Sequence, residues 1–156
     1  MNFDAAFERL IGHEGGYVFD RRDPGGETKY GISKRAYPNE DIRNLTLERA
    51  KEIYHRDYWE AIRAEDLPEK VRFHVFDMAV NAGRKTAIKL LQRAVGVEDD
   101  GIYGNLTHAA VRYADPETLL ARFSGHRLKY YTDLKTWPTF GKGWTRRVAD
   151  NLMASS

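Results

Sequence analysis

Two acidic residues and a hydroxyl near the N-terminus have the types and the spacing to act on a glycosidic bond. Glu14 precedes a Gly-Gly pair, Asp23 opens an Asp-Pro-Gly-Gly turn nine residues later, and Thr28 follows that turn. Cleavage of a glycosidic bond needs one carboxylic acid that protonates the leaving oxygen and a second carboxylate that activates water or stabilises the oxocarbenium-like transition state. Glu14 and Asp23 fit these two roles, and the hydroxyl of Thr28 could hold the water.

The residues before Glu14 predict a helix that sets the protonation of its side chain. Asn2 is the predicted N-cap, and apolar residues follow it at helical spacing, at Phe3, Phe7, Leu10 and Ile11. We expect Gly15-Gly16 to end this helix, so that Glu14 lies where the helix dipole places partial negative charge. This charge and apolar neighbours both raise the pKa of a carboxyl group, as a general acid requires, whereas Asp23 stays ionised in its polar turn.

The remaining elements must bring Asp23 and Thr28 back beside Glu14. Residues 17–19 and the turn at residues 23–26 predict a short, irregular β-hairpin near the N-terminus. Apolar periodicity and Pro or Gly boundaries predict helices at about residues 46–62, 68–83, 87–95, 106–113, 115–134 and 144–152. The helix at 68–83 is apolar nearly all round, which predicts a mainly α domain built around a buried central helix.

Three further side chains are candidates for contact with a sugar. Tyr30 could stack on a sugar ring or pack the hairpin on the core. Asn81, near the end of the central helix, could reach a cleft or make a C-terminal cap contact. Trp137, which precedes a proline in a predicted loop, could touch the substrate, whereas Asp100 and Gly101 are predicted to fix a turn. Each of the three catalytic candidates also has a structural alternative, as a surface residue, a turn former or a strand residue.

The composition and the remaining motifs argue against several other classes of function. The chain has 156 residues, no cysteine and a formal net charge of +2, which excludes disulfides and thiol chemistry and does not indicate a nucleic-acid partner. The basic pair Arg146-Arg147 is predicted to be a solvated helix face. His13-Glu14 begins like a zinc-protease motif, but the residue four after His13 is Tyr17. We therefore expect no metal and no cofactor.

The residues around the catalytic candidates resemble a known family. The stretch 14–17, followed by 23–33, resembles the opening motif of glycoside hydrolase family 108, whose members are N-acetylmuramidases that include phage endolysins. The resemblance implies a lysozyme-like fold with Glu14 as the catalytic acid. The order Glu, Asp, Thr is also similar to the catalytic set of phage-type lysozymes, although Thr28 follows Asp23 by five residues, one fewer than in those enzymes.

Three later segments resemble other parts of the same family. Residues 76–83 are similar to its second signature, residues 87–111 to its peptidoglycan-binding half, and residues 140–144 to its C-terminal Gly-Trp segment. We therefore expect a single domain over residues 1–156, with a catalytic half at 1–83 and a peptidoglycan-binding-like half at 84–156.

The resemblance implies a peptidoglycan hydrolase that cleaves the β-1,4 bond between N-acetylmuramic acid and N-acetylglucosamine. A water positioned by Asp23 and Thr28 would give inversion at the anomeric carbon, and a closer pair of carboxyl groups would favour a covalent intermediate on Asp23. Two alternatives stay open. A lytic transglycosylase would give 1,6-anhydro products, and a non-catalytic protein would bind the cell wall without cutting it.

The start of the chain bears on where such an enzyme would act. Residues 1–8 contain acidic side chains and no long apolar run, so we expect neither a secretory signal peptide nor stable membrane insertion. If the chain is a phage endolysin, it would accumulate in the host bacterial cytoplasm and reach the periplasm or cell wall after a holin opens the membrane. We expect it to act as a monomer.

Overall fold

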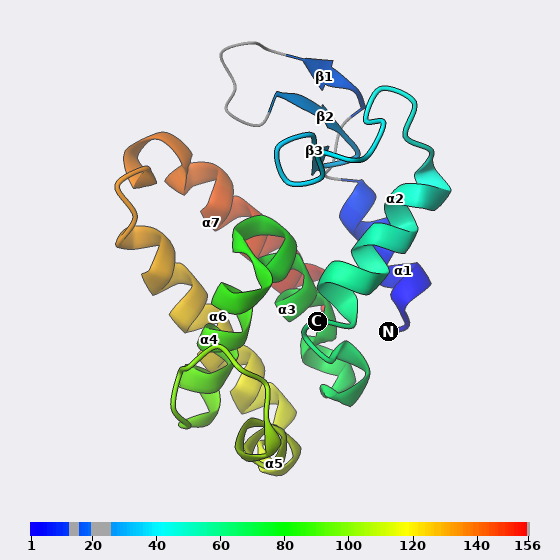
Figure 1. The fold of residues 1–156 in the computed structure, drawn as a ribbon. Helices are drawn as coiled ribbons and strands as arrows, with labels where there is room; N and C mark the ends of the chain where they lie inside the picture. Colours follow the sequence, from blue (N-terminus) through cyan, green and yellow to red (C-terminus); the bar gives the residue numbers. More distant parts are fainter. Residues whose placement is uncertain (13–15, 20–25, 156) are drawn as a thin grey trace. The chain divides into compact units, whose positions relative to one another are not determined.

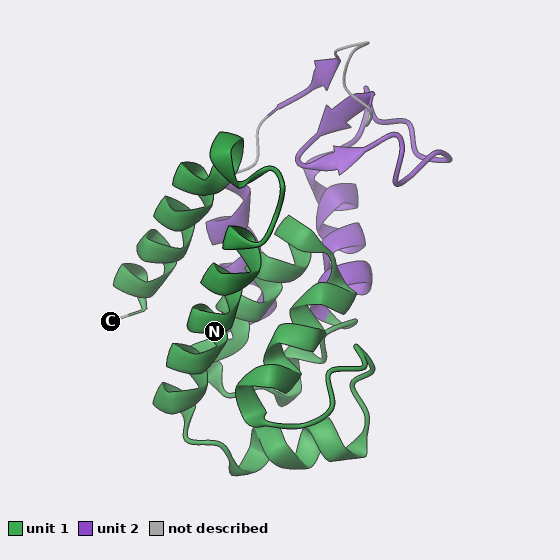
Figure 2. Ribbon diagram, turned by 90° about the vertical axis from the view of Figure 1, so that its left-hand side faces the viewer, with its two compact units in different colours: residues 1, 60–156 green, residues 2–59 purple. Residues whose placement is uncertain are grey.

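The computed structural model describes residues 1–12, 16–19 and 26–155. The chain divides into two compact units, which Figure 2 shows in different colours. The smaller unit comprises residues 2–59, and the larger unit comprises residue 1 and residues 60–156. This division falls before the central helix, which therefore belongs to the larger unit.

The smaller unit combines two helices, a one-turn π-helix and a small sheet. Its elements are α1 (Phe3–Ile11), β1 (Val18–Phe19), β2 (Glu27–Lys29), β3 (Ile32–Ser33), α2 (Leu47–Tyr54) and the π-helix η1 (His55–Trp59) (Figure 1). Asn2 caps α1 as predicted, because its side chain accepts a hydrogen bond of 2.9 Å from the Ala5 amide. The prediction that Gly15-Gly16 ends the helix is wrong: α1 ends at Ile11, and Gly12 is its C-cap.

The predicted hairpin is part of a three-stranded antiparallel sheet with the order β1-β2-β3. The third strand arises because Tyr30 and Gly31 connect β2 to β3 in a two-residue turn between the paired residues Lys29 and Ile32. Both turn residues have positive φ, 51° at Tyr30 and 77° at Gly31, as tight hairpin turns of the type I′ class require. Glycine adopts this conformation freely, whereas Tyr30 adopts it at a cost in backbone strain.

The larger unit is helical in the part that the structure describes. Its elements are the 3₁₀ turn η2 (Ala64–Asp66), α3 (Glu69–Ala82), α4 (Arg84–Val95), α5 (Asn105–Tyr113), α6 (Pro116–Thr132) and α7 (Trp137–Ala154). Helix α3 packs against both α4 and α6, and α6 packs in turn against α7 (Figure 1). Every residue of α3 from Phe73 to Ala79 is buried, which confirms the predicted buried central helix. The fold is mainly helical, with a small antiparallel sheet near the N-terminus, as the sequence predicts.

Glycine and proline set several helix boundaries. Gly83 ends α3 and Gly96 ends α4, both with positive φ, as expected of C-terminal caps. Pro68 is the N-cap of α3, whereas the sequence predicts it as the first residue of the helix. The prediction of a loop at Trp137-Pro138 is wrong, because Trp137 is the first residue of α7. A proline in the first turn of a helix loses no hydrogen bond, so Pro138 fits the first turn of α7 and does not interrupt it.

Candidate functional site

Thr28 is the one catalytic candidate within the described residues, since Glu14 and Asp23 lie outside them. It occupies the middle of the central strand β2 and is half-buried. Val18 of β1 and Ser33 of β3 lie directly opposite it, so these three side chains share one face of the sheet. Glu27 and Lys29 lie on the other face. The sheet therefore presents the Thr28 hydroxyl beside a second hydroxyl group, that of Ser33.

The backbone of Tyr30 is held in place by helix α2. The Tyr54 hydroxyl donates a hydrogen bond of 2.6 Å to the Tyr30 carbonyl oxygen. The half-buried ring of Tyr30 lies under the Lys29 ammonium, 5.5 Å from the nitrogen to the ring centroid. The turn is thus anchored through the main chain of Tyr30, and the anchoring bond does not involve its ring.

Asn81 reaches sideways from the end of α3 to helix α6. Its Oδ1 accepts a hydrogen bond from the hydroxyl of Tyr131. The cap of α3 is instead made by the Gly83 amide, which donates to the Ala79 carbonyl at 2.8 Å. The alternative role of Asn81 as a capping side chain is therefore taken by the main chain.

A cluster of four aromatic side chains from α6 and α7 lies next to Asn81. We call this cluster the aromatic ledge, and its members are Tyr131, Trp137, Phe140 and Trp144. Tyr131 stacks on Trp144 with 4.7 Å between ring centroids and 19° between ring planes. Phe140 and Trp137 lie 5.7 Å and 6.5 Å from Trp144. Tyr131 is buried, Trp137 and Trp144 are half-buried, and Phe140 is 53% exposed, so the ledge has a buried base and an accessible edge.

Gly141 allows the Trp137 indole to lie directly on helix α7. A Cβ at this position would be 2.5–2.7 Å from three indole atoms, which is closer than real contacts allow. Gly141→Ala is therefore expected to displace Trp137 and to lower the free energy of unfolding by about 1–3 kcal/mol, as overpacking does. Denaturant unfolding followed by tryptophan fluorescence measures both effects.

Gly143 supplies the matched control for this substitution, because a Cβ there meets nothing within 4 Å in the same helix. Gly143→Ala is expected to raise stability by up to about 1 kcal/mol through helix propensity. Equal stability of the two variants, with unchanged tryptophan emission in both, would show that Trp137 does not need the glycine.

A buried carboxylate ties α3 to α6 and α7. Asp77 is fully buried and accepts hydrogen bonds from Arg127 (2.7 Å), Arg147 (2.7 Å) and Asn151 (2.9 Å). Burial by itself raises the pKa of Asp77, but the charges and hydrogen bonds of the two arginines outweigh it and hold this pKa below its ordinary value. We call these four residues the Asp77 network.

One feature of the sequence indicates this network. Asp77 is an acidic residue in a helix that is otherwise apolar nearly all round, and a buried charge in such a place needs partners. Arg147 is one of those partners and its side chain is only 19% exposed, so the prediction of a solvated face is wrong for this residue.

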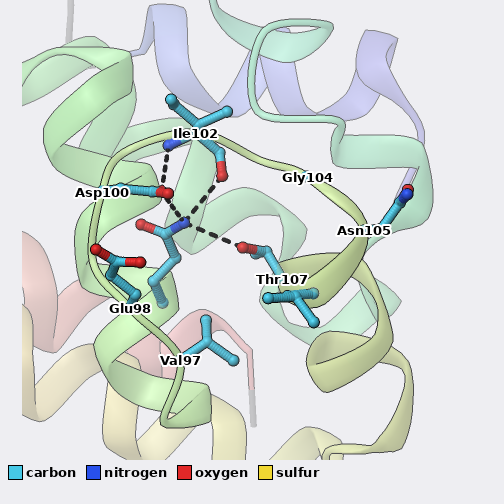
Figure 3. Close-up of a pocket in the computed structure, with 9 residues that line it drawn as sticks. Val97, Glu98, Asp100, Ile102, Gly104, Asn105 and Thr107 are labelled. Atoms are coloured by element: carbon cyan, nitrogen blue, oxygen red, sulfur yellow. Dashed lines mark hydrogen bonds between the residues drawn. The ribbon is translucent and has the colours of Figure 1, made fainter.

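A pocket of about 210 Å³ lies between α4 and α5, where Asp100, Ile102 and Thr107 line it (Figure 3). Gln92 of α4 also lines this pocket. Gln92 is buried; its Nε2 donates to Asp100, to the Ile102 carbonyl and to Thr107 at 2.9–3.0 Å, and its Oε1 accepts from the Gly101 amide at 2.8 Å. Asp100 also accepts from the Ile102 amide, and Gly101 has a φ of 78°, so both fix the turn as predicted. The pocket is below the size of most ligand sites, which begin near about 300 Å³.

Within the described residues, no group of three or more His, Cys, Asp or Glu side chains is placed to hold a metal ion. None of the helices in the same part of the chain has the length and hydrophobicity needed to cross a bilayer.

Comparison with known proteins places this arrangement in a family. The family model described as Glycosyl hydrolase 108 matches residues 7–83, and the model described as Predicted Peptidoglycan domain matches residues 86–149. The solved structure of Brucella abortus SagA matches with a TM-score of 0.89 and 35% sequence identity, covering 98% of this chain and 92% of that chain. The chain belongs to the glycosyl hydrolase 108 family. No curated protein sequence matches it.

Family membership confirms the resemblance seen in the sequence and the assignment of the chain as a glycoside hydrolase with peptidoglycan as its target. The family 108 match contains all three catalytic candidates, together with Tyr30 and Asn81. Trp137 and the other residues of the aromatic ledge fall within the peptidoglycan-domain match. Asn81 and Trp137 are connected through Tyr131 and Trp144 in the larger unit, whereas Thr28 and Tyr30 belong to the smaller unit.

Proposed function

We propose that this family 108 protein is an N-acetylmuramidase that hydrolyses the β-1,4 bond between N-acetylmuramic acid and N-acetylglucosamine. The observation that carries this proposal is the pairing of a family 108 match over residues 7–83 with a peptidoglycan-domain match over residues 86–149. Similarity to SagA along nearly the whole of both chains supports it.

Glu14 is the general acid in this proposal. It protonates the oxygen of the leaving sugar as the glycosidic bond breaks, and the sugar that is left behind develops oxocarbenium character. The role requires a carboxyl group that is still protonated when substrate binds, hence one with a raised pKa.

Asp23 and Thr28 position the attacking water on the opposite face of the sugar ring. Asp23 accepts a proton from the water, and the Thr28 hydroxyl orients it. This geometry gives inversion and requires about 6.5–9.5 Å between the carboxyl groups of Glu14 and Asp23, whereas about 5 Å would favour a covalent intermediate on Asp23. Thr28 lies on the central strand of the sheet, where a neighbour on each side fixes its backbone.

Substrate contacts come from aromatic and amide side chains. The candidates are Tyr30, Asn81 and Trp137. The C–H faces of a pyranose pack on aromatic rings, and its polar substituents form hydrogen bonds with amide groups. The anchoring of Tyr30 through its carbonyl and the position of Trp137 on the aromatic ledge are compatible with these roles.

The masses of the fragments released from purified peptidoglycan test the proposal. Hydrolysis adds one water to each cleaved bond, so the fragments are expected to be reducing muropeptides. Fragments that are one water lighter would identify a lytic transglycosylase instead. Sedimentation with the walls without any released fragment would identify a non-catalytic wall-binding protein.

We further propose an endolysin role, with cytoplasmic accumulation in a host bacterium and release to the wall by a holin. The motif at residues 14–33, which resembles that of phage endolysins, supports this role. Bacteria that express the chain alone are expected to grow until their membrane is opened, by a holin or by chloroform, and then to lyse within minutes. Optical density records the outcome, and lysis in cells with an intact membrane would contradict this route.

A further inference from the structure

A directed chain of hydrogen bonds connects the Asp77 network to Asn81. Arg127, held by Asp77, donates from its Nε to the hydroxyl oxygen of Tyr131 at 3.0 Å. Arginine can only donate, so the hydroxyl of Tyr131 must use its own proton elsewhere. Two acceptors lie within its reach, Oδ1 of Asn81 and, at 3.4 Å, the sulfur of Met78. A thioether sulfur is the weaker acceptor, so the proton goes to Oδ1 of Asn81. The buried carboxylate therefore sets the direction of every bond up to the amide.

The consequence is a fixed orientation of the Asn81 amide. Because Oδ1 accepts from Tyr131, the amide nitrogen Nδ2 is the group that is left to donate to another partner. Asn81 is half-buried, and in the described part of the chain its Nδ2 makes no hydrogen bond. Asn81 thus offers an available hydrogen-bond donor at a partly accessible position.

The aromatic ledge starts from the same tyrosine. The hydroxyl of Tyr131 bonds to Asn81, and the face of its ring stacks on Trp144, so Asn81 contacts the ledge through Tyr131, the buried member of the ledge. The accessible edge of the ledge continues over Trp137 and Phe140. An apolar surface with one fixed donor beside it matches a sugar ring that bears one strong acceptor.

We propose that Asn81 and the aromatic ledge form a subsite for an N-acetylated amino sugar, in which Asn81 Nδ2 donates to the acetamido carbonyl oxygen and the sugar ring packs on the ledge. The proposal rests on the proposed function for its substrate class and goes beyond it by naming the recognised group. Tyr131 and Arg127 are positioning residues, because they act through Asn81.

The same geometry rejects an amino sugar that lacks the acetyl group. A free amino group has no carbonyl oxygen to accept from Asn81 Nδ2, and in its protonated form it can only donate, so it would leave the Asn81 donor without a partner. The subsite therefore distinguishes N-acetylated glycan from de-N-acetylated glycan.

Two soluble probes test the subsite in the full-length chain, a β-1,4 tetramer of N-acetylglucosamine and the corresponding tetramer of glucosamine. Binding is followed by the ¹⁵N–¹H signals of the tryptophan indoles and of the Asn81 side chain, with the tetramers checked by mass afterwards. The wild type is expected to bind the N-acetylated tetramer at least about ten times more tightly, as loss of one hydrogen bond in a specific site predicts, with shifts at Asn81 and Trp144.

Asn81→Asp is the decisive variant, because it keeps the acceptor for Tyr131 and replaces the donor by a second acceptor. We expect it to lose the preference for the N-acetylated tetramer and to favour the glucosamine tetramer. Tyr131→Phe keeps the stacked ring and removes the bond to Asn81, so it should weaken binding of the N-acetylated tetramer alone, by roughly five- to tenfold. Tyr113→Phe, at a tyrosine that is 92% exposed, is the matched control and should change neither affinity.

Retention of the wild-type preference by Asn81→Asp would overturn the subsite, and so would a wild type that binds neither tetramer. These titrations do not depend on bond cleavage. A chain that binds with the expected preference but releases nothing from peptidoglycan would overturn the proposed function and leave the subsite standing. Cleavage of peptidoglycan by a chain that shows no preference for the N-acetylated tetramer would overturn the subsite and leave the proposed function standing.

Discussion

Glu14→Gln is expected to lower the rate of peptidoglycan hydrolysis by roughly a hundred- to ten-thousand-fold, the range that a general acid contributes. Glutamine keeps the size and polarity of the side chain but cannot give a proton to the leaving oxygen. The release of reducing ends from purified walls measures the rate. Binding of the variant to walls and its thermal unfolding should equal those of the wild type, because the change affects the transition state and not the bound substrate.

Glu8→Gln is the matched control, since it removes an exposed carboxylate from α1, in the same part of the chain. Its rate is expected to stay within about twofold of the wild type, because exposed charges contribute little. Near wild-type hydrolysis by Glu14→Gln would show that Glu14 is not the acid. A loss in both variants would point to the charge of this region and not to proton donation.

Asp77→Ala is expected to cause the largest loss of stability of any single substitution discussed above. It leaves the fully buried Arg127 without its carboxylate and also removes a partner of Arg147 and Asn151. Breaking a buried ion pair in this way costs about 3–5 kcal/mol, a large part of the total stability of a typical domain. Denaturant unfolding measures the loss.

Asp99→Asn provides the comparison, because Asp99 pairs with Arg93 at the surface at the same distance of 2.7 Å that Asp77 has to Arg127. Its cost is expected to stay below about 1 kcal/mol. Similar losses at Asp77 and Asp99 would mean that burial does not set the strength of these pairs.

The Asp77 network also predicts how stability depends on pH. The pKa of Asp77 lies below its ordinary value of 3.8 in the folded chain, so the unfolded state takes up the proton first as the pH falls. Its contribution is complete above about pH 4–5 and is lost as the pH falls toward the folded pKa. Asp77→Asn should therefore show a shallower loss of stability below pH 4 than the wild type, and equal slopes would contradict a lowered pKa.

The sequence was most informative where local chemistry decides the structure. Asn2, Gly83 and Gly96 cap helices as predicted, because capping depends on the conformation of one residue and the bonds next to it. The buried central helix followed from its apolar surface. These features need no knowledge of how distant segments pack.

The predictions from the sequence were wrong or incomplete where one local pattern is compatible with two structures. Pro138 could end one helix or start the next, and the fold uses it to start α7. Tyr30 gave no hint of positive φ, because only the pairing of β2 with β3 places it in a tight turn. Arg147 has the sequence setting of a surface residue, and its bond to Asp77 spans 70 positions of the chain.

The residues of the candidate site also fall into those that the sequence predicts and those that depend on contacts between distant segments. Residue type and spacing predict Glu14, Asp23 and Thr28 as catalytic residues, and all three lie within the range of the family match. The part played by Tyr131 could not be found from the sequence, because it depends on contacts with residues of α3 and α7 that are distant along the chain. Asn81 was a candidate with two roles. Its side chain bonds to Tyr131, and the cap of α3 is made by the Gly83 amide.

The identity of the sugar at each new reducing end tests the central claim most directly. Borohydride reduces only the sugar exposed by cleavage, and acid hydrolysis then releases it as an alcohol. We expect muramitol, produced at a rate that falls to background in Glu14→Gln. Glucosaminitol in its place, or no reduced sugar at all, would contradict the account of this chain as a muramidase.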